Sequence, residues 1–389
     1  TATTEIYTLS LHDALPISKS YIKHFLKIKK GNDFNLNTIK EKIEVLNSLT
    51  FASQIKPPEV LFTKDSTSLY LYIEKTKSNN FDGFLGFGTN ETTNKIEFSG
   101  YLNLSIVNNL NYGESFNLVY KSDENEQKTF EVNFNLPYIF GSALGTEFNL
   151  NIFKKDSTYT TVNQSVGLFY QINAKQKIGV GIEGILSNNL LDDATSTAIQ
   201  DYNSVFYSLG YQYIKRQYYN LLFPVNFVFD LKISFGKRNF ESTTEKQMLF
   251  NLNTFKNFNL NTKNSIYIRL NSAGINSDNF FTNELLRFGG IKSIRGFEEN
   301  RLIASLYSVF NTEYRYRLNN NMYIHSIVDA AYFENDITQT KEKLFAFGFG
   351  FGVFTKAGLL KFNYANGKSE SQKFNFSDSK IHISLSTIF

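Results

Sequence analysis

Residues 344–354 read Leu-Phe-Ala-Phe-Gly-Phe-Gly-Phe-Gly-Val-Phe. Successive side chains of a β-strand point to opposite faces, so every second residue shares a face. One face of this stretch carries only aromatic side chains: Phe345, Phe347, Phe349 and Phe351. The other carries only small residues: Ala346, Gly348, Gly350 and Gly352. This pattern predicts a strand with one face toward an apolar medium and the other toward a crowded or polar interior.

The same period of two recurs from residue 81 to the end of the chain, between clusters of Asn, Asp, Ser, Gly and Lys. Sixteen segments follow it: 81–90, 95–107, 115–122, 128–136, 143–153, 160–172, 177–186, 201–214, 220–234, 246–259, 263–273, 303–318, 322–333, 342–355, 358–366 and 380–389. Most are long enough to cross a bilayer at a tilt, which takes about 9–11 residues. An even count is typical of a single-chain bacterial barrel. We therefore predict an all-β transmembrane barrel of sixteen antiparallel strands over residues 81–389. A soluble sandwich is the alternative, and its strands average only about 5–6 residues.

Composition excludes several other classes of protein. The 389 residues include 39 Phe and 23 Tyr but no Cys, so disulfide scaffolds and Cys-ligated metal sites are excluded. The four His show no metal-binding spacing. A net charge of +4 is too balanced to favour nucleic acid. No run approaches the roughly 18 apolar residues of a membrane helix.

The N-terminal residues differ from the rest. Residues 1–19 lack an initiator Met and a signal-peptide pattern, and we expect them to be non-native, with the natural chain continuing further upstream. Residues 20–80 predict a small α+β domain. Its expected parts are a strand over 21–28, a helix whose apolar positions include Ile39 and Leu46, and a strand pair, 59–63 with 68–74.

The last predicted strand alternates Ile381, Ile383 and Leu385 with polar residues and ends on Phe389. An apolar terminal strand left unpaired would be an aggregation-prone edge. Pairing 380–389 with 81–90 closes the barrel. Glycines at 83, 86 and 88 weaken pairing in the first strand, so this junction is a physically reasonable place for a lateral opening.

Residues 287–297, in the long connection 274–302, read Arg-Phe-Gly-Gly-Ile-Lys-Ser-Ile-Arg-Gly-Phe. This run resembles the Arg-Gly-Phe signature of the BamA/TamA/FhaC superfamily of outer-membrane barrels. The matching positions are Gly289, Gly290, Ser293, Ile294, Arg295, Gly296 and Phe297. The turns 109–114 and 137–141 also resemble turns of the family. The final strand resembles its β-signal, with Ile381, Ile383, Leu385 and Phe389 as the positions concerned.

The resemblance implies that the Arg-Gly-Phe loop folds back into the barrel lumen. Arg295 would then be a buried cation, which needs acidic partners, and Asp329 and Glu313 are the candidates on neighbouring lumen faces. The small face of the strand 342–355 would leave room for this loop. Residues 20–80 would correspond to the last of the periplasmic POTRA domains that precede such barrels.

The resemblance implies an outer-membrane factor that inserts or exports unfolded client proteins, with no covalent catalysis, cofactor, metal or nucleic acid. Its expected surroundings are the outer-membrane bilayer and periplasmic, lipoprotein or inner-membrane partner subunits. Alternatives are a two-partner-secretion exporter of a soluble partner and a passive porin-like barrel, which would not need the Arg-Gly-Phe loop. Two other charged clusters are read as solvated: Asp192, Asp193 and Asp201 lack calcium-loop spacing, and Glu298 and Glu299 lie beside Arg301.

Overall fold

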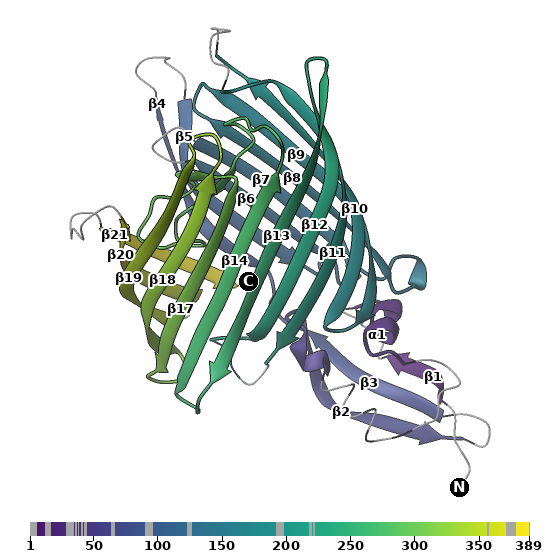
Figure 1. The fold of residues 1–389 in the computed structure, drawn as a ribbon. Coiled ribbons are helices and arrows are strands. Elements are labelled where there is room, and N and C mark those ends of the chain that lie inside the picture. The colour runs from purple at the N-terminus through teal and green to yellow at the C-terminus, as the bar shows by residue number, and fades with distance from the viewer. Residues whose placement is uncertain are drawn as a thin grey trace.

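The structure is a computed structural model. It describes residues 6–11, 17–28, 35, 37, 39, 42, 45–63, 67–89, 96–122, 127–191, 198–217, 220, 222–355, 358–370 and 379–388. Sixteen antiparallel strands form a closed barrel, which confirms the predicted count and class (Figure 1). The strands in chain order are β4 Asn80–Thr89, β5 Ile96–Val107, β6 Ser115–Ser122, β7 Gln127–Leu136, β8 Leu144–Lys155, β9 Tyr159–Asn173, β10 Gln176–Asn189, β11 Tyr202–Arg216, β12 Val225–Phe240, β13 Thr243–Asn259, β14 Asn264–Asn276, β17 Leu306–Arg317, β18 Met322–Asn335, β19 Thr340–Thr355, β20 Gly358–Ser369 and β21 Ser379–Ile388.

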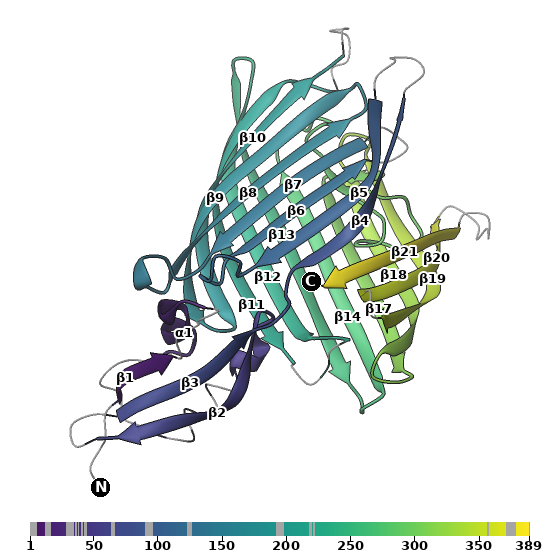
Figure 2. The same ribbon diagram turned by 180° about the vertical axis from the view of Figure 1, so that it is seen from behind.

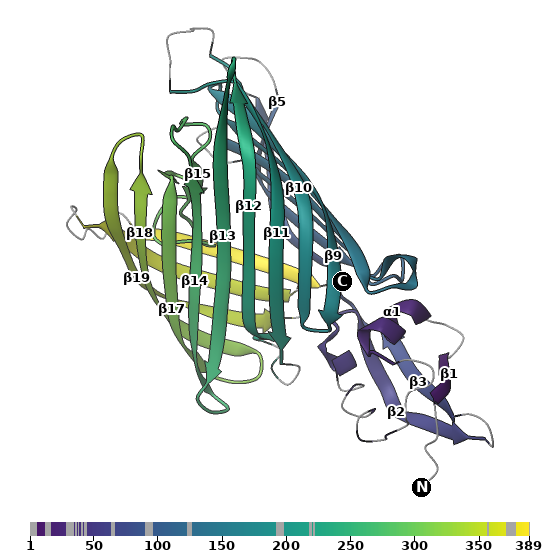
Figure 3. The same ribbon diagram turned by 45° about the vertical axis from the view of Figure 1, so that its right-hand side comes forward.

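The connection between β14 and β17 is the longest within the described barrel. We call residues 277–305 the lumenal loop; it contains the short strands β15 Leu286–Phe288 and β16 Leu302–Ala304, which pair with each other. Strand length varies around the barrel. β6 has 8 residues and β13 has 17, and the long strands β11 to β13 face the viewer in Figure 3.

Apolar side chains form continuous rows on the outer face of the barrel. Phe148, Val166, Ile182, Tyr207 and Phe235 lie opposite one another on β8 to β12 in successive pairings. Each of the five is exposed, Tyr207 to 66 %. The neighbouring positions in sequence point inward and are mostly polar or small. The period of two thus separates an apolar outside from a polar inside along every one of these strands.

The N-terminal residues form a three-stranded sheet of order β1-β3-β2, from β1 Ile6–Leu11, β2 Ala52–Phe62 and β3 Thr67–Lys75. The predicted strand over 21–28 is wrong, because Lys19–Phe25 form the helix α1, capped by the Ser18 side chain. Ile39 and Leu46 are buried in the hydrophobic core of the N-terminal residues, and a 3₁₀ turn spans Val45–Ser48. β1 pairs in parallel with β3.

That residues 1–19 are non-native stays a prediction. Among the described residues, no helix is long and apolar enough to cross a membrane.

Helix α1 packs against two turns at the near end of the barrel. The Ser18 amide donates to the Asn111 carbonyl at 2.6 Å. The Tyr21 ring fills the space that a Cβ at Gly113 would need, and its centroid lies 5.0 Å from that of Tyr138 in an edge-to-face contact. Tyr138 shares one buried cluster with α1. These contacts connect the N-terminal sheet to the barrel at the β5–β6 and β7–β8 turns.

The barrel closes where β21 meets β4, a junction that we call the seam. Only two residue pairs join these strands among the described residues, Thr387 with Phe81 and Ile388 with Asn80. By contrast, β10 and β11 are joined by twelve. Figure 2 shows β21 meeting β4 near the C-terminal end of β21. Toward the N-terminal end of β21 the two strands diverge.

Candidate functional site: the lumenal loop and the seam

Arg295 of the lumenal loop contacts two carboxylates from the barrel wall. Its Nε donates to Asp329 Oδ2 at 2.8 Å, its Nη2 to Asp329 Oδ1 at 2.5 Å, and its Nη1 to Glu313. The backbone amide of Arg295 also donates to Asp329, at 3.1 Å. Asp329 lies on β18 and Glu313 on β17. The two strands are hydrogen-bonded neighbours, so their lumen faces present both acids to the same point.

These three charges are removed from solvent. The side chain of Asp329 is 0 % exposed and that of Arg295 is 6 % exposed. Burial lowers the pKa of the Arg295 guanidinium, but the hydrogen bonds and charges of Asp329 and Glu313 outweigh it, so this pKa lies above its ordinary value. Glu313 also accepts from Arg315 Nε at 2.7 Å. The arrangement therefore holds the loop in one position with its charge compensated.

Glycines shape the loop on both sides of Arg295. Gly289, Gly290 and Gly296 have φ of 111°, 92° and 83°, a region that L-residues rarely adopt. A Cβ on Gly296 would lie 2.5 Å from the amide nitrogen of Gly367 on β20, and the Phe297 ring covers Gly367. The motif therefore packs its backbone directly on the wall.

The space for the loop comes partly from a different strand than expected. Ala346 of β19 does share the buried cluster of Ile294 and Phe297. The volume beside Gly350 and Gly352, however, is occupied by the His325 and Tyr323 side chains. The expectation that the small face of residues 342–355 leaves room for the loop is therefore wrong at Gly350 and Gly352, and Gly367 of β20 is the glycine that packs against the Arg-Gly-Phe backbone.

Glu298 and Glu299 are not a simple surface cluster. Glu298 does contact Arg301 at 2.6 Å, but it also binds Lys380 of β21 at 3.1 Å. Glu299 binds Lys121 of β6 at 2.7 Å. Hydrogen bonds from Lys380 and Arg301 hold the pKa of Glu298 below its ordinary value. Nothing in the sequence spacing relates these acids to lysines 82 and 178 positions away.

A second buried ion cluster holds the first part of the loop and has no counterpart in the sequence prediction. Arg238 of β12 donates to Glu245 of β13 and to Glu284 of the loop, and its guanidinium lies 4.1 Å from the Phe281 ring centroid. Burial raises the pKa of Glu284, although Arg238 opposes this. Arg238 and Glu245 lie outside the predicted strands 220–234 and 246–259, so the sequence prediction places neither of them on a lumen face.

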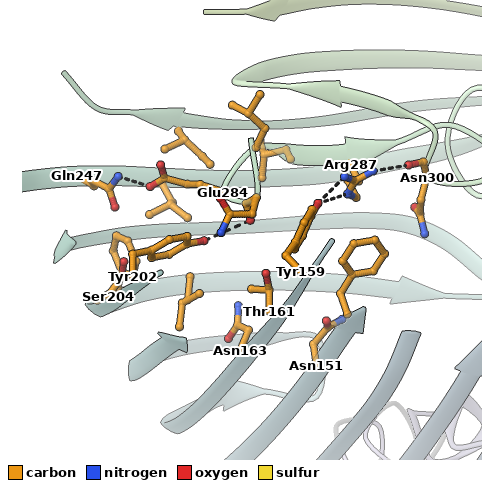
Figure 4. Close-up of a pocket in the computed structure, with 18 of the residues that line it drawn as sticks. Asn151, Tyr159, Thr161, Asn163, Tyr202, Ser204, Gln247, Glu284, Arg287 and Asn300 are labelled. Carbon is orange, nitrogen blue, oxygen red and sulfur yellow. Dashed lines mark hydrogen bonds between the residues drawn. The ribbon is translucent and has the colours of Figure 1, made fainter. Parts of the chain in front are cut away.

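Among the described residues, two of the cavities in the barrel lie beside the loop. One, of about 380 Å³, lies between the loop and strands β7 to β14, where Arg287 Nε donates to Tyr159 Oη at 3.1 Å (Figure 4). The other, of about 650 Å³, lies on the seam side and is lined by Arg295, Glu299, Asp82 and Ser386 among others. The loop thus contributes to the lining of both cavities, and the larger of the two lies next to the seam.

The expected β-signal positions lie on β21. Ile381, Ile383 and Leu385 are exposed on the outer face, Ile383 to 69 %, while His382, Ser384 and Ser386 line the seam-side cavity. Phe389 lies outside the described residues, as do Asp192 and Asp193. Within the described part of the chain, Asp201 accepts from the Asn189 amide at 2.5 Å, and no group of His, Asp and Glu there has metal-binding geometry.

Comparison with solved structures finds barrels of the same fold. CdiB from Acinetobacter baumannii superposes with a TM-score of 0.66 at 17 % identity, covering 100 % of this chain and 74 % of that one. CdiB from Escherichia coli gives 0.65 at 14 %, covering 100 % and 77 %. BamA from Haemophilus ducreyi lacking POTRA domains 1–3 gives 0.60 at 14 %, covering 100 % and 85 %. No family model and no curated protein matches the sequence. The resemblance expected from the Arg-Gly-Phe motif is thus confirmed as a likeness of fold: the chain has the barrel fold of BamA and CdiB.

Proposed function

We propose that this chain is an outer-membrane barrel that inserts or exports client proteins without covalent catalysis. The observation that carries the proposal is the seam, closed by two residue pairs in a barrel whose neighbouring strands pair over most of their length. The lumenal loop next to it, with Arg295 in a buried ion cluster, supports the same function.

The outer face favours a membrane location. The exposed rows of Phe, Val, Ile and Tyr on β8 to β12 would be unfavourable in water and are stabilised by lipid. A barrel satisfies its backbone hydrogen bonds internally, as a bilayer requires. We place the barrel in the outer membrane of a Gram-negative bacterium and the N-terminal sheet, as a POTRA-like domain, in the periplasm.

The seam provides edges for a client strand. Each ladder hydrogen bond contributes about 0.5–1.5 kcal/mol net, so a closure through two residue pairs is worth only a few kcal/mol. Opening it exposes unpaired edges of β4 and β21 that pair with an incoming strand. The client then gains hydrogen bonds, and its apolar side chains move from water to lipid. These gains supply the free energy, so no nucleotide or cofactor is needed.

The N-terminal sheet offers a first contact for unfolded clients. Its edge strand β2 exposes Leu61 to 51 % and Phe62 to 58 %. Addition of a client strand to such an edge is a common mode of peptide recognition. Partner subunits of periplasmic, lipoprotein or inner-membrane type would extend this system.

A disulfide across the seam tests the proposal. Continuing the pairing of Phe81 with Thr387 by one residue places Asp82 opposite Ser386, and both line the same cavity. We would introduce Asp82→Cys with Ser386→Cys and measure insertion of a model outer-membrane protein into liposomes. The chain has no native Cys to interfere.

The matched control joins two strands that we expect to stay paired. Ser208 and Ser234 are directly opposite on β11 and β12, so Ser208→Cys with Ser234→Cys closes a fully paired ladder. We expect the seam disulfide to abolish insertion and its reduction to restore it, whereas the control disulfide has no effect. Equal insertion in the two oxidised variants would refute lateral opening. Ion conductance without insertion in any state would instead favour export through the lumen or a passive pore.

A further inference from the structure

Most of the described part of β21 makes no ladder pairs with β4. Its other edge pairs with β20 from Ser379 to Ser386, whereas toward β4 the described residues pair only at Thr387 and Ile388. The two strands diverge over the remaining length (Figure 2). Backbone hydrogen bonds therefore do not hold the far part of the seam.

Two adjacent carboxylates of the lumenal loop bind opposite sides of this unpaired part. Glu298 binds Lys380, at the start of β21 and at the end away from the two seam pairs. Glu299 binds Lys121 of β6, on the other side of the seam beyond β4 and β5. Because the two acids are neighbours in one loop, the two ion pairs together connect β21 with β6 across the place where the ladder is absent.

The loop presents both carboxylates from a fixed backbone. Arg295, three residues before Glu298, is held by Asp329 and Glu313. Glu299 also accepts from the Ile291 amide at 3.2 Å, in a turn where only glycine fits at position 290. A rigid support lowers the entropic cost of forming the two ion pairs.

We propose that Glu298 and Glu299, with Lys380 and Lys121, form an ion-pair bridge that holds the two sides of the seam together from the lumen and must break before the barrel opens. This inference deepens the proposed function, because it concerns control of the same seam. The four side chains are 25–38 % exposed. Partly exposed pairs typically shift an equilibrium by about 1.5- to 5-fold each, and two of them by roughly 2- to 25-fold.

Pulsed electron spin resonance on the full chain in liposomes measures the bridge directly. Spin labels at Asn103→Cys on β5 and Ser384→Cys on β21, both lining the seam-side cavity, report the ratio of long to short distances. We expect Glu298→Gln with Glu299→Gln to raise this ratio by roughly 2- to 25-fold at low salt. High salt should raise it in the unmodified chain and much less in the variant.

Two further variants separate the bridge from general charge effects. Glu147→Gln removes the Glu147–Lys177 pair, which has similar exposure and a length of 2.9 Å but lies on β8 and β10, so the ratio should not change. Lys380→Glu should raise the ratio, and adding Glu298→Lys should lower it again. Heat-dependent electrophoretic mobility verifies that each variant folds.

Two results would overturn the bridge: a ratio in the double Gln variant equal to that of Glu147→Gln, or a reciprocal charge swap that stays as open as Lys380→Glu alone. This readout needs no client. A shifted ratio without client insertion would support the bridge and refute the proposed function. If the distance ratio is unchanged but clients are inserted and the seam disulfide blocks that insertion, the proposed function is supported and the bridge is refuted.

Discussion

Removal of the Arg295 side chain should release the lumenal loop while leaving the barrel folded. In Arg295→Ala, Asp329 loses both of its hydrogen bonds to the arginine side chain and keeps the bond from the backbone amide of residue 295 only if the loop stays in place. Its side chain is 0 % exposed, so the carboxylate would be buried without a counter-charge. Glu313 is less affected, because Arg315 still donates to it.

The magnitude follows from this burial. Removing one partner of a buried ion pair costs about 3–5 kcal/mol. At about 1.4 kcal/mol per factor of ten, the equilibrium between docked and undocked loop shifts by roughly 10²- to 10⁴-fold. The rest of the barrel keeps its ladders, so this cost falls on the loop and not on global unfolding. Arg295→Met with Asp329→Leu removes both charges and should recover most of the docking, because well-packed apolar groups often replace buried ion pairs without loss.

Hydrogen exchange of residues 289–299 measures the docking. In the native loop the Ser293 amide donates to the Gly290 carbonyl and the Gly290 amide to the Ile294 carbonyl, so both should be protected. We expect Arg295→Ala to lower protection by roughly two orders of magnitude or more and Arg301→Ala, whose side chain is 69 % exposed, to leave it unchanged. Protection in Arg295→Ala within a factor of two or so of the native chain would refute the reasoning, since the loop would then be held by contacts other than this cluster.

Three further predictions follow from the same contacts. Gly296→Ala should undock the loop, because its Cβ would lie 2.5 Å from the Gly367 amide and its φ is 83°; an unchanged exchange pattern would contradict this. Gly113→Ala should separate the N-terminal sheet from the barrel, because its Cβ would lie 2.1 Å from the Tyr21 ring; limited proteolysis should then release the sheet from an intact barrel, and resistance equal to the native chain would count against it. The pKa of Glu298 is lowered from 4.5. Its ion pair is therefore complete above pH 4.5 and is lost as the pH falls through the lowered pKa. The spin-label distance ratio should stay constant from neutral pH to about pH 5 and rise only in more acidic buffer.

The barrel could be predicted almost strand by strand, because the alternation of apolar and polar residues that defines each strand lies within that strand's own sequence. A lipid-facing row and a lumen-facing row impose a period of two that any ten residues reveal, as in β19. The interval 21–28 is too short for that test. Its apolar positions fit both a strand and a helix, and the helix is decided by the Ser18 cap and by the contact of Tyr21 with a turn 92 residues later.

Contacts of the site can be predicted from the sequence only where a buried charge requires side chains of the opposite charge. A buried Arg295 requires acids, and few acids lie on neighbouring lumen faces, which leads to Asp329 and Glu313. The Arg238 cluster and the lysine partners of Glu298 and Glu299 could not be inferred in this way. The pairs of Arg238 with Glu284, Glu298 with Lys380 and Glu299 with Lys121 each join the loop to a distant strand, and the path of a thirty-residue loop across the lumen decides which charges meet.

The unequal strand lengths have a consequence for the surrounding lipid. On the seam side, the described parts of β4 to β7, β20 and β21 have 8 to 12 residues, whereas β12 and β13 on the far side have 16 and 17. A tilted strand of ten residues rises roughly 25 Å, which is less than the hydrocarbon thickness of about 30 Å. In the outer-membrane location that we propose, the bilayer would have to thin next to the described parts of these strands to match this height. Under the proposed function, a client strand leaving the barrel there would move its polar side chains through a thinner apolar layer than on the far side.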